Sequence, residues 1–199
     1  MNVQHVNVKV FVEKPEAIDF ADFISIFTGW IQARSNAELL IDVADYRHVF
    51  AGPGIVLIGH EANYSLDNAD NRPGLLYNRK AQLTGSPRDR IEQALRSALL
   101  ACRRLEAEPL WQGKLKFSGQ AMQLLLNDRL IAPNTAATFA ALSPALKAVF
   151  DRLYGGAEYT LTQRGDPRER FTVNVSTTIP FDVNTLLRNL SLEPEAAHA

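Results

Sequence analysis

The side chains best suited to acid–base chemistry gather in one stretch of this chain, around a predicted hairpin. They are Asp42, Asp45, His48, His60, Glu61, Asn63 and Tyr64. If residues 51–54 close a four-residue turn, Asp45 faces His60 across the two strands, and such neighbours are close enough for an imidazole–carboxylate hydrogen bond. This pair could orient His60 as a general base. Glu61 points to the opposite face, because adjacent strand residues alternate in direction.

A structural explanation of His60 competes with the catalytic one. A strand histidine can bond to a carboxylate or to the backbone without taking part in chemistry. A metal site needs three or four converging ligands, and His48 lies on the opposite face from His60 in this register. We therefore predict no metal here. His60 with Asp45 is the catalytic hypothesis that the sequence offers.

The segment from residue 60 to residue 80 is the second region with binding character. Hydrogen-bonding and aromatic side chains beside a rigid sheet are typical of ligand-binding segments. The candidates for contacts with a small molecule are Asn63, Tyr64, Tyr77 and Arg79. Within this segment, residues 67–74 are rich in Asp and Asn, which favours a polar turn. Their spacing lacks the glutamate and the fixed glycine of an EF-hand.

Motifs of the common cofactor and catalytic sites do not occur in this sequence. Gly52, Gly54 and Gly59 lie between two predicted strands, whereas a dinucleotide fingerprint needs a strand that leads into a helix. The sequence has no Walker motif, no Gly-x-Ser-x-Gly elbow and no His-Glu-x-x-His. Cys102 is the single cysteine, and its apolar helical surroundings indicate a core residue. We predict no cofactor, and the sequence leaves open whether the protein is an enzyme.

The bulk composition indicates a soluble globular protein. Of the 199 residues, 46% are hydrophobic and 22% are charged, which is the ordinary range. The net charge of −1 provides no long-range attraction for nucleic acid or an anionic membrane. No apolar run is long enough to span a bilayer, and no basic-then-apolar leader begins the chain. We expect a cytoplasmic protein that binds neither nucleic acid nor a membrane.

Hydrophobic periodicity predicts an α+β fold. Residues 6–13 alternate as a strand, and residues 16–33 follow with helical spacing. Ser86 and Pro87 begin the clearest helix. Asn134 is expected to cap a short helix, and Ser143-Pro144 to start another. The pattern predicts a mostly antiparallel central sheet of about seven or eight strands, with helices packed mainly on one face.

The two ends of the chain follow a similar plan. Residues 6–66 and 115–176 each read as a β-α-β-β unit, and Phe20 of the first aligns with Phe139 of the second. This suggests an internal duplication, although unrelated units could give the same pattern because helices and strands have only two periods. No linker interrupts the chain, so we predict a single compact domain over residues 1–199, with 177–199 as a C-terminal tail.

Two functions are compatible with these observations. The first is a non-enzymatic binding or assembly module that acts as a homo-oligomer, with a homodimer formed through the uncovered sheet face as the expected form. It is motivated by the missing catalytic signatures and by the surplus of apolar strand residues. The alternative is a small-molecule enzyme or ligand-binding domain with its site around His60 and the 60–80 segment. Fold alone does not decide between them.

Overall fold

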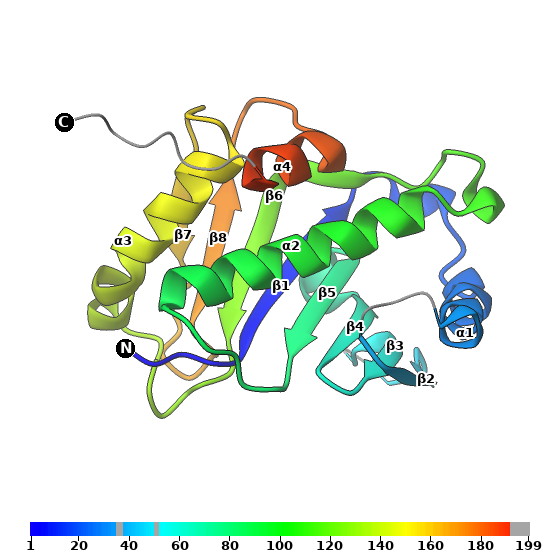
Figure 1. Ribbon diagram of the computed structural model, residues 1–199, viewed down its shortest axis with the longest axis horizontal. Coiled ribbons are helices and arrows are strands. Elements are labelled where there is room, and N and C mark those ends of the chain that lie inside the picture. The colour runs from blue at the N-terminus through cyan, green and yellow to red at the C-terminus, as the bar shows by residue number, and fades with distance from the viewer. Residues whose placement is uncertain (35–37, 50–51, 192–199) are drawn as a thin grey trace.

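The computed structural model describes residues 1–34, 38–49 and 52–191, and it contains one eight-stranded sheet (Figure 1). The strands are β1 (Val6–Val12), β2 (Leu40–Tyr46), β3 (Gly54–Gly59), β4 (Ala62–Asp67), β5 (Gly74–Arg79), β6 (Phe117–Leu126), β7 (Thr160–Gln163) and β8 (Thr172–Ser176). Their order is β2-β3-β4-β5-β1-β6-β8-β7, and every neighbouring pair is antiparallel. The predicted α+β class is therefore confirmed.

Helices cover one face of this sheet. They are α1 (Asp22–Ala33), α2 (Pro87–Glu106), α3 (Ala136–Leu153) and α4 (Val183–Ser191), with short 3-10 turns η1 (Pro15–Ala17), η2 (Ala69–Asn71) and η3 (Pro109–Trp111). Helix α2 crosses β1 and β5, α1 lies on β2 and β3, and α3 and α4 pack against α2 (Figure 1). Strand alternation turns Val6, Val8 and Val10 toward these helices, where they are buried.

Local capping determines where α2 begins, whereas packing determines the extent of α3. Ser86 caps α2 through a capping box with Asp89, as its position before Pro87 predicts. The expected pair of helices from Asn134 and from Ser143 is wrong, because α3 is one helix that Thr135 caps and that contains Pro144. A proline in a helix interior is unfavourable. The helix continues through it because its apolar stripe is buried on both sides of Pro144.

The internal duplication is not confirmed by the arrangement of the strands. The element order β1-α1-β2-β3 does recur as β6-α3-β7-β8. In the second unit β8 pairs directly with β6, whereas in the first unit β4 and β5 separate β3 from β1. The two units therefore share an order of elements but differ in strand pairing.

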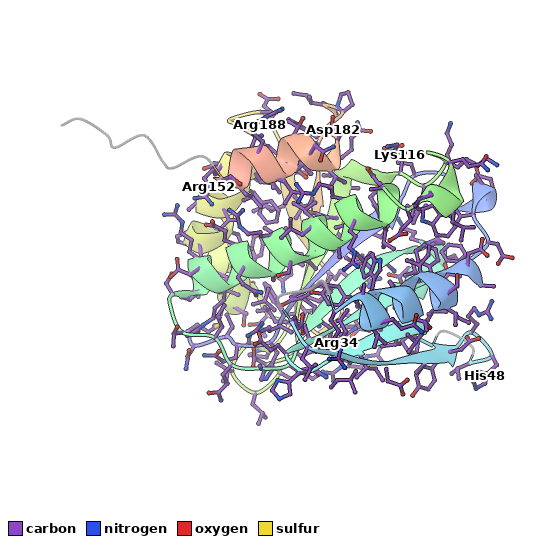
Figure 2. All side chains as sticks on the ribbon, turned by 45° about the vertical axis from the view of Figure 1, so that its right-hand side comes forward. Arg34, His48, Lys116, Arg152, Asp182 and Arg188 are labelled. Atoms are coloured by element: carbon purple, nitrogen blue, oxygen red, sulfur yellow. The ribbon has the colours of Figure 1, made fainter. Side chains whose placement is uncertain are left out.

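The first part of the predicted tail docks on the body as α4. Arg96 of α2 and Arg152 of α3 each donate to the carbonyl oxygen of Leu190 at 2.7 Å. Figure 2 shows Arg152 beside the C-terminal end of α4. Cations at a helix C-terminus satisfy its last carbonyl groups and complement the helix dipole. The remainder of the predicted tail, residues 192–199, lies outside the described residues.

The sheet face that carries no helix is polar at its centre, and it is nevertheless buried. Asn7 is 0% exposed and Lys9 is 2% exposed. The Lys9 ammonium pairs with Asp67 and donates to the carbonyl oxygen of Ala69 at 3.2 Å. Both amide atoms of Asn7 lack a hydrogen-bond partner within the described part of the chain.

Two loops from opposite ends of the sheet meet across this polar face. The β4–β5 loop lies where β1 ends, because Phe11 pairs with Gly74. The β7–β8 loop lies where β1 begins, because Leu125 pairs with both Asn7 and Thr172. An ion pair nevertheless joins Asp70 of the first loop to Arg164 of the second at 3.0 Å. The sheet is therefore coiled, and the loops close over Asn7 and Lys9.

Candidate functional site

The predicted contact between His60 and Asp45 does not form. Asp45 pairs with Ile55, because residues 47–53 make a longer connection than the expected four-residue turn. Residues 50–51, part of that expected turn, lie outside the described residues. His60 is exposed beyond the end of β3, where its backbone N–H donates to Leu39. The pairing register therefore separates the two groups of the catalytic hypothesis.

Asp45 and His48 instead lie at the turn end of the β2–β3 hairpin, where Tyr46 pairs with Gly54. Asp45 is exposed and binds Arg47 through both carboxylate oxygens. These hydrogen bonds lower the pKa of Asp45 to about 2. His48 lies at the far end of this hairpin (Figure 2). Among the described residues no group of three His, Cys, Asp or Glu is placed to hold a metal ion.

Asn63 faces away from the other predicted ligand contacts. It is paired with Asn78 across β4 and β5, and Asn78 is paired with Asn7 of β1. The three amides therefore form a row on the polar face, while Tyr64 points to the helical side. The carbonyl oxygen of the Asn63 side chain is buried without a partner among the described groups.

Three predicted residues, Tyr64, Tyr77 and Arg79, converge at a groove between α1 and α2. We call it the α1–α2 groove, and its volume is about 660 Å³. This is within the size range of small-molecule sites. Its lining consists of Trp30, Glu38, Glu61, Tyr64, Arg79, Gln93, Ser97, Leu100, Ala101, Arg103 and Arg104. Tyr77 lies beneath it, because its hydroxyl accepts a hydrogen bond from the lining residue Gln93 at 3.0 Å.

Glu38 organises one side of the groove. Its Oε1 accepts hydrogen bonds from the backbone N–H groups of Glu61 at 3.1 Å and Ala62 at 2.5 Å. Its Oε2 accepts from the hydroxyl of Tyr64 at 3.0 Å. Burial, with Glu38 beside it, raises the pKa of the Tyr64 phenol. Tyr64 is therefore a fixed, neutral hydroxyl rather than a general base.

Arg79 supplies a buried cation at the groove. It is 7% exposed, and it donates to Glu61 at 2.9 Å and to the carbonyl oxygen of Ala81 at 2.9 Å. Burial opposes its charge, but interactions with Tyr77 and Glu61 outweigh that effect and raise the pKa of the guanidinium. Arg79 can therefore orient a polar ligand without changing its own protonation.

The opposite wall of the groove combines an aromatic ring with further arginines. The guanidinium of Arg104 lies 4.0 Å from the ring centroid of Trp30, and the indole N–H donates to Glu108 at 2.6 Å. Arg103 is exposed at the rim. Trp30, Arg103 and Arg104 were not singled out from the sequence as binding residues. The signal that could have revealed them is the polar row Gln93, Ser97 and Arg104 along α2.

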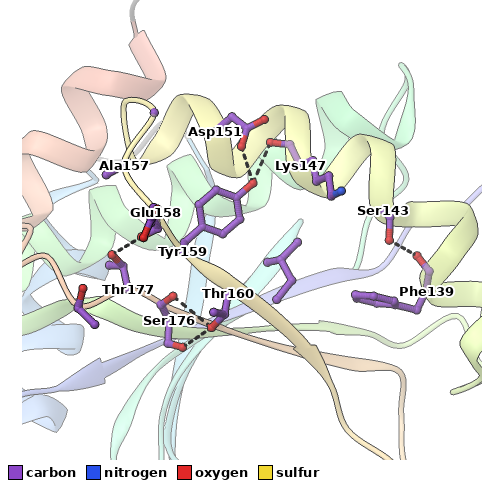
Figure 3. Close-up of a pocket in the computed structure, with 13 residues that line it drawn as sticks. Phe139, Ser143, Lys147, Asp151, Ala157, Glu158, Tyr159, Thr160, Ser176 and Thr177 are labelled. Atoms are coloured by element: carbon purple, nitrogen blue, oxygen red, sulfur yellow. Dashed lines mark hydrogen bonds between the residues drawn. The ribbon is translucent and has the colours of Figure 1, made fainter.

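A second, larger cavity of about 990 Å³ lies between α3 and the edge strand β7, and we call it the α3–β7 groove. Figure 3 shows Tyr159 reaching from the start of β7 toward α3, with its hydroxyl 2.6 Å from Asp151 Oδ1. Phe139, Ser143 and Lys147 of α3 form one wall, and Leu161 of β7 lies opposite. No sequence motif pointed to this region, because short uncharged strands and exposed helix faces are common.

Comparison with known families, curated proteins and solved structures found no match to this chain. Within the described residues, no helix has both the length and the apolar character needed to cross a bilayer.

Proposed function

We propose that this protein is a non-enzymatic binding or assembly module that acts as a homo-oligomer. The observation that carries the proposal is the eight-stranded sheet, which ends on each side in a strand with no second neighbour among the described residues. Unpaired edges expose backbone hydrogen-bonding groups that another chain can use. The separation of His60 from Asp45 adds support, since it removes the acid–base pair that the sequence suggested.

Native mass spectrometry of the full chain over a range of concentrations tests this proposal. We expect a dimer whose population grows with concentration, because association follows mass action. The sheet edge is a better candidate surface than the uncovered face that the sequence favoured, since the centre of that face is polar and closed by two loops. A chain that stays monomeric throughout would contradict the proposal.

A second candidate function is small-molecule binding, or an enzyme activity, in the α1–α2 groove. The observation that favours it is that Tyr64 and Arg79, from neighbouring strands, line one cavity, with Tyr77 beneath it and bonded to one of the lining residues. The carboxylate of Glu38 is already occupied by three donors, and Glu61 is paired with Arg79. The groove therefore presents mainly donors, which suits a ligand rich in acceptor oxygens.

The same native spectra test the second candidate. We expect the as-purified protein to carry a retained small molecule, visible as added mass. Ser97→Trp should displace it, because an indole at this position fills the groove. Ser143→Trp, which fills the α3–β7 groove instead, is the matched control and should leave the added mass in place. Added mass that survives Ser97→Trp would place the ligand elsewhere.

A further inference from the structure

The two edges of the sheet differ in how their outward backbone groups are satisfied. At the β2 edge, the N–H of Val43 donates to Asp42 Oδ1 at 2.8 Å, and the N–H of Arg47 donates to Asp45 Oδ1 at 3.0 Å. A bulge between Leu40 and Asp42 also interrupts the strand. Charges and bulges are devices that prevent edge pairing. The β2 edge is therefore largely blocked by its own side chains.

The β7 edge carries none of these devices. Strand β7 contains no charge, proline or bulge. The N–H of Arg164 donates to the carbonyl oxygen of Thr172 at 2.9 Å, which fixes the alternation of this ladder. Thr160 and Thr162 therefore bond to β8, while Leu161 and Gln163 direct their backbone groups outward. No hydrogen bond occupies those outward N–H groups within the described part of the chain.

There is also room beside this edge for another strand. The α3–β7 groove separates β7 from α3 (Figure 3), so no helix covers the outward backbone groups. Leu161 is partly buried and packs against the core on the helical side of the strand. A strand added here would continue the sheet and cover Leu161.

We propose that two copies of this chain join by antiparallel pairing of β7 with β7 about a two-fold axis at Leu161. This inference rests on the proposed homo-oligomer and names its interface. The register places Leu161 against Leu161 of the second copy, and Tyr159 against Gln163 of the second copy. All three positions direct their N–H and C=O outward, so each pair exchanges both backbone hydrogen bonds.

The side chains of this register are complementary on the other face of the strand. Thr160 lies opposite Thr162 of the second copy, and Thr–Thr pairs are favourable across strands. Glu158 lies opposite Arg164 of the second copy, which pairs unlike charges at both ends of the joint. Arg164 contacts Asp70 and Glu169 in its own chain, so Glu158 extends an existing charge network. The two-fold axis makes each pair other than the central Leu161 pair occur twice.

A proline substitution can test this edge without disturbing the rest of the fold. Leu161→Pro removes an N–H that has no hydrogen bond to any described residue of its own chain, and proline is tolerated on edge strands. We expect the dimer to dissociate roughly thirtyfold more readily, because two intermolecular donors are lost. Ile41→Lys at the β2 edge, where Ile41 is 54% exposed, should leave the dimer unchanged. Circular dichroism checks that each variant is folded.

A cross-link at Leu161 tests the register without relying on the proline variant. Directly paired strand residues have Cα atoms about 5.5 Å apart, within disulfide range, so Leu161→Cys should form a covalent dimer on oxidation. Thr160→Cys is the matched control, because two copies of residue 160 would lie roughly 8 Å apart. Native Cys102 is fully buried and burial raises its pKa, so it should not react.

The possible outcomes test the β7 interface and the homo-oligomer separately. A wild-type chain that is monomeric at every concentration overturns both. A wild-type dimer that survives Leu161→Pro and gives no Leu161→Cys cross-link overturns the β7 interface but keeps the homo-oligomer. If Ile41→Lys alone dissociates the dimer, the interface is the β2 edge. Dissociation of the dimer by Leu161→Pro, together with a covalent dimer of Leu161→Cys, supports the β7 interface.

Discussion

At the scale of single residues, two buried tyrosines differ in whether their hydroxyl groups have a hydrogen-bond partner. Tyr64 is 8% exposed and its hydroxyl donates to Glu38, whereas Tyr154 is 1% exposed and its hydroxyl has no partner among the described residues. A buried hydrogen bond to a charged group contributes about 1.5–3 kcal/mol, and an unpaired buried hydroxyl is a cost. The two tyrosines therefore form a natural comparison.

We expect the two phenylalanine variants to change the free energy of unfolding differently. Tyr64→Phe should lower the free energy of unfolding by about 1–2 kcal/mol, because it leaves Glu38 with one donor fewer. Tyr154→Phe should leave it unchanged or raise it by up to about 1 kcal/mol, because it removes an unsatisfied group from the core. Urea denaturation measures both. Equal losses for the two variants would contradict this assignment.

Tyrosine burial also predicts a loss of stability at alkaline pH. Burial raises the pKa of Tyr64, Tyr154 and Tyr159, while an unfolded tyrosine titrates near about 10. The neutral phenols therefore favour the folded state fully below about pH 10, and this contribution falls as pH rises above that value. Denaturation midpoints between about pH 8 and pH 12, with phenolate absorbance, should show stability falling as the tyrosines ionise on unfolding. Ordinary titration of all tyrosines in the folded protein would contradict it.

At the scale of elements, α2 has the most complete local signals. Ser86 accepts from the backbone N–H of Asp89 at 3.3 Å, and Asp89 accepts from the N–H of Ser86 at 2.8 Å. The hydrogen bonds that the Asp89 carboxylate accepts from the backbone N–H and the hydroxyl of Ser86 lower the pKa of Asp89. The cap therefore stabilises the helix above the ordinary carboxyl pKa and weakens as pH falls below it.

Removing this cap should lower the stability of the protein measurably. We expect Ser86→Ala to lower the free energy of unfolding by about 1 kcal/mol, the usual value for a lost N-cap. Thr84→Ala is the neighbouring control, because Thr84 is exposed and lies before the cap, so this change should alter the free energy of unfolding little. Urea denaturation at neutral and acidic pH compares the two variants. A difference between them that does not shrink in acid would contradict the role of Asp89.

The sequence predicted elements better than it predicted their register. The capping box of Ser86 was readable because all its determinants are local. The Asp45–His60 contact was not, since it depends on the connection over residues 47–53 rather than on either strand. Tyr64, Tyr77 and Arg79 were predicted from their polar and aromatic types, and the structure places them at or beneath one groove. Glu38 was missed because its partners are backbone N–H groups of residues 61 and 62, which no side-chain pattern reveals.

At the scale of the whole molecule, the coiling of the sheet decides which surfaces are available. The face opposite the helices is closed at its centre by the loops that Asp70 and Arg164 join. The sheet edges, the α1–α2 groove and the α3–β7 groove lie outside this closed centre. Both proposals therefore use surfaces that the coiled sheet leaves accessible.

The ion pair between Asp70 and Arg164 should act on both loops together. Asp70→Asn removes it, and we expect faster hydrogen exchange in residues 67–73 and 164–170, while amides of β1 and β6 keep their protection. The loss in unfolding free energy should be small, about 0–1 kcal/mol, because both side chains are partly exposed. Asp166→Asn is the matched control. Among the described residues the Asp166 carboxylate pairs only with Arg168, at 2.8 Å, so this change should affect its own loop alone. If Asp70→Asn changed exchange in its own loop without changing residues 164–170, the closure of the sheet would not depend on this contact.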